Sequence, residues 1–113
     1  MEDCVFCRIA QGDLPSEVVY RDDAVFVIRD ISPKAPVHLL IVPLDHIEAL
    51  SEYAHGREQL IGSLATVAAH IADLQAITKH GYRLVINQGP GAGQTVPHLH
   101  MHLLGGRNLE SMG

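Results

Sequence analysis

The chain has 113 residues, of which 47% are hydrophobic, so we expect a single domain over residues 1–113 with a core of its own. Its formal net charge is -5 with the histidines neutral, and a net negative charge repels phosphate backbones, so general DNA or RNA binding is not expected. No stretch resembles a signal peptide and no apolar run approaches the ~20 residues of a membrane helix, so we expect a cytoplasmic protein without a membrane partner.

The N-terminal segment contains both cysteines of the chain, spaced as Cys4-x-x-Cys7. Residues 4–11 predict a short helix, which Gly12 and Pro15 end. In a reducing compartment, this spacing is typical of two thiolates that share a tetrahedral metal ion. A redox pair is the alternative, but the thioredoxin-like motif follows a strand of a βαβ unit, whereas this one precedes every predicted strand.

Three strands are predicted in the first half of the chain. Residues 17–20 and 24–29 are rich in β-branched side chains, and the polar residues 21–23 between them favour a hairpin. A turn with two prolines then precedes the apolar strand 37–42. Residues 43–53 predict a loop and a short helix.

One long amphipathic helix is predicted over residues 57–78. Its larger apolar side chains recur at spacings of four and three and should cover a sheet; they are Leu60, Leu64, Val67, Ile71 and Leu74. A second, smaller-residue stripe favours contact with another subunit, with burial in the same chain as the alternative; it consists of Ile61, Ala65, Ala68 and Ala72.

Two more strands are predicted at residues 82–87 and 98–104. The loop between them, residues 88–97, contains three glycines and two prolines, and ordered loops of this length are often functional. Strands, a long helix and two further strands predict an α+β fold. We expect a mainly antiparallel five-stranded sheet with one long helix and a short N-terminal helix.

Histidines alternate with apolar residues in the last predicted strand. Because successive side chains of a strand point to opposite faces, His98, His100 and His102 should share one face. Alternate residues lie ~6.8 Å apart, so the outer two are separated by ~13 Å at the backbone. One ion held by all three is therefore disfavoured, although an H-x-H pair could share an ion, and we expect the three histidines to divide their roles.

A neutral imidazole is a good nucleophile near pH 7 because its ordinary pKa is about 6.5. It can attack phosphorus and form a covalent intermediate, which divides one hard substitution into two easier ones. The glycine-rich loop can bring backbone N–H groups against a phosphate, and each is worth roughly 3 kcal/mol when aimed at developing charge. Such donors would replace a lysine or arginine clamp, which we do not expect beside the histidines.

The segment His-Leu-His-Met-His-Leu-Leu at residues 98–104 resembles the signature of the histidine triad (HIT) family, in its Hint-like branch. The resemblance covers nearly the whole chain. The nucleoside-binding half of that family is similar to four segments of this chain, residues 30–33, 35–38, 42–43 and 46–47. Its phosphate-binding half is similar to Asn87 and to residues 93–96 and 105–107.

This resemblance implies a role for each catalytic side chain. His100 would be the nucleophile that forms a nucleotidyl-histidine intermediate. His102 would contact the phosphate and assist the leaving group, with help from Thr95 or a nearby donor. His38 would lie at the edge of the site in a supporting role.

The resemblance also implies how a nucleotide is held. Asp30 would accept hydrogen bonds from the ribose hydroxyls, and Ile31 would pack against the nucleoside. The phosphate would be contacted by Asn87, Gly93, Gln94, Thr95, His100 and His102. A turn cap at Asn87 and an ordinary turn acid at Asp30 are the alternatives.

A further implication is a structural zinc site, with one ion per chain. Relatives that carry C-x-x-C bind zinc through two cysteines, another histidine and the first triad histidine. The corresponding ligands here are Cys4, Cys7, His46 and His98, and four protein ligands leave no open position for water.

The resemblance implies a homodimeric hydrolase of the purine nucleoside phosphoramidase type, which releases a nucleoside monophosphate from AMP or GMP conjugates. Dinucleoside polyphosphate hydrolysis and nucleotidyl transfer are alternatives within the family. A zinc-dependent hydrolase would instead lose all activity with a chelator. A non-catalytic purine nucleotide-binding protein would bind AMP without turnover.

Overall fold

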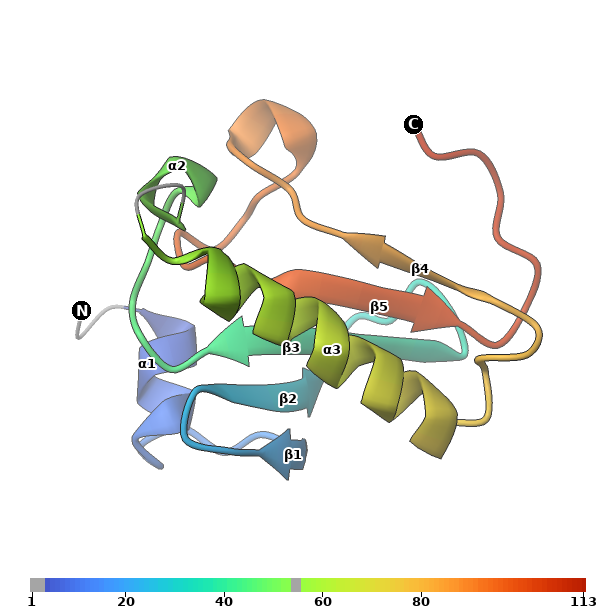
Figure 1. Ribbon diagram of the computed structural model, residues 1–113, viewed down its shortest axis with the longest axis horizontal. Helices are drawn as coiled ribbons and strands as arrows, with labels where there is room; N and C mark the ends of the chain where they lie inside the picture. The colour runs from blue at the N-terminus through green and yellow to red at the C-terminus, as the bar shows by residue number, and fades with distance from the viewer. Residues whose placement is uncertain (1–3, 54–55) are drawn as a thin grey trace.

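The sheet that organises the protein has five antiparallel strands in the order β1-β2-β3-β5-β4, in a computed structural model that describes residues 4–53 and 56–113 (Figure 1). The strands are β1 Val18–Arg21, β2 Val25–Arg29, β3 Val37–Pro43, β4 Tyr82–Val85 and β5 Met101–Gly105. The helices are α1 Val5–Ala10, α2 Leu50–Tyr53, α3 Glu58–Leu74 and the 3-10 turn η1 Pro90–Ala92. The predicted α+β fold is confirmed.

The β1–β2 hairpin forms at the predicted polar turn. Asp22 shapes this turn, because its Oδ1 accepts hydrogen bonds from the backbone N–H groups of Ala24 and Val25, each at 2.8 Å. The Tyr20 hydroxyl donates to the other oxygen of the same carboxylate at 2.8 Å. These bonds fix the turn, and the pairing of β2 with β3 holds the hairpin in the sheet.

One face of the sheet is covered by α3 (Figure 1). The core between them is made by side chains of α3, of the turn after it and of alternate strand positions: Val25, Val27, Leu39, Ile41, Leu64, Val67, Ala68, Ile71, Ala72, Ile77, Met101 and Leu103. Ala68 and Ala72, which favoured contact with another subunit, thus pack within their own chain. Ala65 of the same stripe is exposed.

The long helix is shorter than predicted, since it ends at Leu74 instead of reaching residue 78. The N–H of Ala76 bonds to the Asp73 carbonyl, and the N–H of Ile77 bonds to the Ala72 carbonyl, both at 3.0 Å. This is a Schellman motif, in which Ala76 takes the left-handed position with φ of 60°. The prediction that Leu74 covers the sheet is wrong, because its side chain lies beyond the core and is 65% exposed.

The opposite face of the sheet is partly covered by α1. Phe6 and both cysteines pack there against Phe26, Ile28, Leu40 and Val42 of β2 and β3. No helix within residues 4–53 or 56–113 is long and apolar enough to cross a membrane.

The histidine-rich strand also begins later than predicted, at Met101 instead of His98. Its ladder with β3 ends at the Ile41–Met101 pair. Before this point the N–H of Leu99 donates to the Ile47 carbonyl at 2.6 Å, so the backbone follows the loop between β3 and α2. Only His102 of the three histidines lies within the strand.

Candidate active site and metal cluster

A cavity of about 820 Å³ lies on the sheet face opposite α3. Its apolar wall includes Val5, Phe6 and Ile9 of α1 and Leu40 of β3. Its polar lining includes Asp30, His38, Asn87, Gly93, Thr95, His100 and His102. Except for Gln94, the predicted nucleotide-binding and catalytic residues therefore surround one space large enough for a small molecule.

His100 is buried at the inner end of this cavity, with 6% of its surface exposed. Its Nδ1 lies 2.8 Å from the His98 carbonyl oxygen, which can only accept, so Nδ1 carries the proton. In the neutral ring this leaves the lone pair on Nε2. The Phe6 ring packs edge-on against the imidazole with centroids 5.0 Å apart, and so holds its orientation.

His102 and His38 form a hydrogen-bonded pair beside His100. The backbone N–H of Lys34 donates to Nδ1 of His38 at 3.0 Å, so the proton of His38 is on Nε2. That N–H donates to Nδ1 of His102 at 2.9 Å, which places the His102 proton on Nε2. His102 can therefore donate a hydrogen bond from Nε2, the ring nitrogen that does not face His38.

Burial keeps both members of this pair neutral. It lowers the pKa of His38, although the nearby Asp30 carboxylate opposes this effect. Burial, followed by the positive charges of His100 and His38, lowers the pKa of His102 to about 4. At neutral pH both imidazoles of this pair are therefore uncharged in the free protein.

Asp30 lies beside the pair, with Oδ2 at 3.4 Å from Nε2 of His38. The possible ligand atoms of Asp30, His38 and His102 all lie within 4.8 Å of one another, which raises the question of a metal ion. Binding through Nε2 of His38 would require the proton on Nδ1, where it would face the Lys34 N–H. The tautomer therefore fits a proton-carrying pair and does not fit a metal site.

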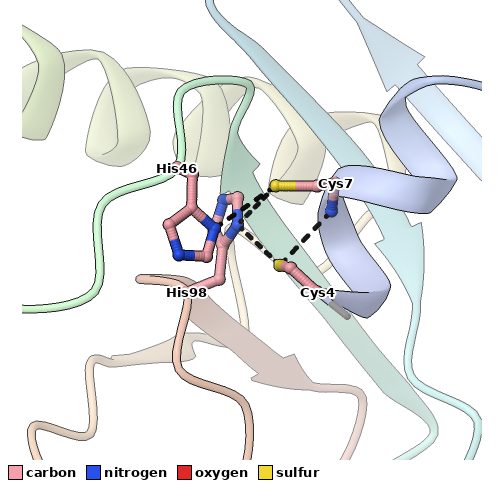
Figure 2. A group of neighbouring side chains, drawn as sticks. All are labelled: Cys4, Cys7, His46 and His98. Carbon is pink, nitrogen blue, oxygen red and sulfur yellow. Dashed lines mark hydrogen bonds between the residues drawn. The ribbon is translucent and has the colours of Figure 1, made fainter. Parts of the chain in front are cut away.

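A second cluster, of two cysteines and two histidines, lies at the base of α1 (Figure 2). Nδ1 of His98 is 3.2 Å from Sγ of Cys4 and 3.6 Å from Sγ of Cys7. Nδ1 of His46 is 3.3 Å from Sγ of Cys7. Sulfur and nitrogen ligands of a tetrahedral zinc ion are about 3.6 Å apart, so the four side chains are close to the spacing that one ion requires.

The outer nitrogens of the two histidines support this role. Nε2 of His98 donates to the Pro43 carbonyl at 2.9 Å, and Nε2 of His46 lies 3.4 Å from Oε1 of Glu48. Both partners accept, so both Nδ1 atoms keep a lone pair for a metal. Burial raises the pKa of the Cys7 thiol to about 11, and a bound cation is what would hold it as a thiolate.

The predicted phosphate loop lies where it was expected, with one difference. Asn87, Gly93 and Thr95 line the cavity. The Gln94 side chain instead holds the loop, because its Oε1 accepts from the Gly89 N–H at 2.8 Å and its Nε2 donates to backbone carbonyls. Gln94 therefore affects the cavity only by fixing the shape of this loop.

Two features of the cavity were not expected from the sequence. The sequence did not single out Lys34, yet this residue lines the cavity, and its charge adds to burial in lowering the pKa of His38 and His102. The wall formed by Val5, Phe6 and Ile9 was also missed. Its only signal was the apolar face of the short helix that carries the cysteines.

Comparisons with known proteins agree with this arrangement. The HIT domain profile matches residues 11–109. A purine nucleoside phosphoramidase of Escherichia coli (strain K12) is 46% identical over 111 residues, which cover 98% of this chain and 93% of that protein.

Solved structures are similar over nearly the whole chain. A HIT family hydrolase from Clostridium thermocellum has a TM-score of 0.94 and 44% identity, covering 98% of this chain and 96% of that one. A zinc-bound histidine triad family protein from Mycobacterium smegmatis has a TM-score of 0.83 and 32% identity, covering 99% of this chain and 81% of that one.

Proposed function

Since this chain belongs to the HIT domain family, we propose that it hydrolyses purine nucleoside phosphoramidates or related nucleotidyl conjugates and releases the nucleoside monophosphate. The observation that carries this proposal is the tautomer of His100. A buried imidazole with its proton bonded to a carbonyl presents an unprotonated Nε2 in a cavity lined by a second histidine donor. The similarity to a purine nucleoside phosphoramidase supports the substrate class.

In the first step, Nε2 of His100 attacks the α-phosphorus. The new P–N bond to the imidazole forms as the bond to the leaving amine breaks, and the amine nitrogen takes a proton. In the second step, water attacks the same phosphorus and gives a proton to Nε2 of His102, the bond to Nε2 of His100 breaks, and the nucleoside monophosphate leaves. The hydrogen bond to the His98 carbonyl stabilises the positive charge that His100 carries in the intermediate.

His102 is the source of the proton for the leaving amine in this proposal. Its pKa is low in the free protein, but an anionic phosphate beside it favours the charged form and raises that pKa. The substrate complex can therefore take up a proton at Nδ1 of His102, where it replaces the hydrogen bond from His38. Donation from Nε2 of His102 returns the pair to its neutral state.

The other residues hold the nucleotide. We place the ribose hydroxyls at Asp30 and the nucleoside against Ile31 and the apolar wall of α1. Asn87 and the backbone around Gly93, with Thr95, would contact phosphate oxygens. Gly93 suits this position because its φ of 99° is left-handed, and its lack of a side chain leaves the backbone open to a ligand.

The metal cluster is proposed to bind one structural zinc ion per chain through Cys4, Cys7, His46 and His98. The zinc-bound relative supports this choice of metal. When bound, zinc would only cross-link three segments: α1, the loop after β3 and the segment before β5. Two cysteines that bind a metal instead of forming a disulfide suit a reducing compartment, and we propose the cytoplasm.

We also propose a homodimer that pairs two sheets at an edge strand and packs the α3 helices together. The support is apolar surface that the single chain leaves exposed. Leu74 of α3 is 65% exposed, and Leu84 of the edge strand β4 is 37% exposed.

The test is release of AMP from adenosine 5'-phosphoramidate by the wild type, by His100→Ala and by chelator-treated wild type. We expect about a thousandfold loss or more in His100→Ala, and retained turnover after chelation. His80→Ala, at an exposed histidine outside the cavity, is the matched control and should keep full activity. A folded wild type that binds AMP without turnover would instead indicate a nucleotide-binding protein.

A further inference from the structure

Among residues 4–53 and 56–113, the lining of the cavity contains one cation, Lys34, that has no carboxylate within ion-pair distance. Its charged lining side chains there are Arg29, Asp30 and Lys34. Arg29 pairs with the carboxylate of Glu17, and Asp30 faces His38. Lys34 has no acidic partner in the described chain, and its Nζ donates to the backbone oxygen and, at 3.4 Å, to the hydroxyl of Ser32.

Hydrogen bonds hold both the backbone N–H and the backbone carbonyl of Lys34 in place. Its N–H donates to Nδ1 of His38 at 3.0 Å, and its carbonyl accepts from the guanidinium of Arg107 at 2.8 Å. The ammonium therefore has a defined place at the rim, beside the histidine pair. Its field reaches that pair, since it is one of the charges that lower the pKa of His38 and of His102.

A positive charge here has a physical use. The protein carries a formal charge of -5, so its long-range field opposes the approach of a nucleotide anion. An ammonium that no carboxylate pairs with gives a phosphate anion a local attraction inside the cavity, against this long-range field. It also favours ligands that carry a phosphate over ligands of the same shape without one.

We propose that Lys34 is a specificity-determining residue whose ammonium attracts and holds the negative charge of the nucleotide. This inference rests on the proposed function only in taking a nucleotide as the ligand. The backbone N–H of Lys34, which orients His38, is retained when the side chain is replaced. A side-chain substitution therefore separates the charge from the tautomer that the turn imposes.

The experiment compares binding of AMP and of adenosine, by calorimetry, to the wild type, Lys34→Gln and Lys34→Glu. At low ionic strength we expect Lys34→Gln to weaken AMP binding about three- to tenfold and Lys34→Glu to weaken it further. Adenosine, which lacks the charge, should bind all three proteins within about twofold. High ionic strength should narrow the differences for AMP.

The matched control is Lys79→Gln, at an exposed lysine in the turn after α3 and outside the cavity lining, which should bind AMP as the wild type does. Equal weakening of AMP and adenosine would show that Lys34 shapes the pocket, and would overturn the proposal. Unchanged AMP binding in Lys34→Glu would overturn it as well. The Lys34 experiment measures binding and does not require turnover. A wild type that binds AMP but releases none from adenosine 5'-phosphoramidate would therefore refute the proposed hydrolase, and the role of Lys34 would still be tested.

Discussion

Acidification should lower the free energy of unfolding, and His102 should account for a large part of this loss. Burial, and then the charges of His100 and His38, lowers its pKa in the folded protein from 6.5 to about 4. Between these values the unfolded chain binds a proton that the folded chain does not. The contribution of His102 is therefore complete above about pH 6.5 and is lost as the pH falls toward 4.

The size of this effect follows from the shift. One pKa unit corresponds to about 1.4 kcal/mol, so His102 can remove up to about 3 kcal/mol over this interval. A domain of this size is stable by only about 5–15 kcal/mol, so the effect is measurable. Burial lowers the pKa of His38 and His98 in the same direction, and the total loss should be larger than that of His102 alone.

The assay is urea unfolding of the wild type and His102→Gln at about pH 7 and about pH 4.5, with a chelator throughout so that metal release contributes equally. The variant should lose about 2 to 3 kcal/mol less than the wild type on acidification. His80→Gln, at an exposed site, should behave as the wild type does. The same acid-dependent loss in His102→Gln and wild type would refute the assignment of the titration to His102.

Three further predictions concern the packing and the metal. Ala76→Gly should raise the free energy of unfolding by about 0.5–1 kcal/mol, measured by urea unfolding, because its φ of 60° is strained for a residue with a side chain. Gly105→Ala should lower the unfolding temperature, because its Cβ would lie 2.8 Å from Cδ1 of Ile77, whereas Gly91→Ala, with no atom within 4 Å, should not. Cys7→Ser should abolish stoichiometric zinc, measured by elemental analysis, and full zinc content in this variant would contradict the proposed ligand set.

Much of the fold could be predicted because its signals are local. The turn at Asp22 and the periodicity of α3 each depend on a few neighbouring residues, and the structure has both elements. The boundaries that were wrong depend on partners distant in sequence or on a cap without glycine. The strand that should begin at His98 begins at Met101 because the Leu99 N–H bonds to another loop.

The features of the candidate site that could be predicted from the sequence were also the local ones. The C-x-x-C spacing and the alternating histidines pointed to two centres because each motif lies within a few residues. Phe6 and Lys34 were missed because the sheet, and not their own neighbours, brings them to the cavity. Pairing of β3 with β5 places His38 beside His102, and the turn before β3 then places Lys34 at the same rim.

The three triad histidines are chemically alike in sequence but are distinguished by the partner that each proton meets. The proton of His98 bonds to the Pro43 carbonyl, so its Nδ1 faces the cysteines. The proton of His100 bonds to the His98 carbonyl, so its lone pair is on Nε2, as the proposed nucleophile requires. Nδ1 of His102 accepts from His38, so its own proton is on Nε2, as the proposed proton donor requires. Because one residue, His98, offers its ring to the metal cluster and its carbonyl to His100, the proposed zinc ion would act on the proposed reaction only by positioning His100, without a chemical role of its own.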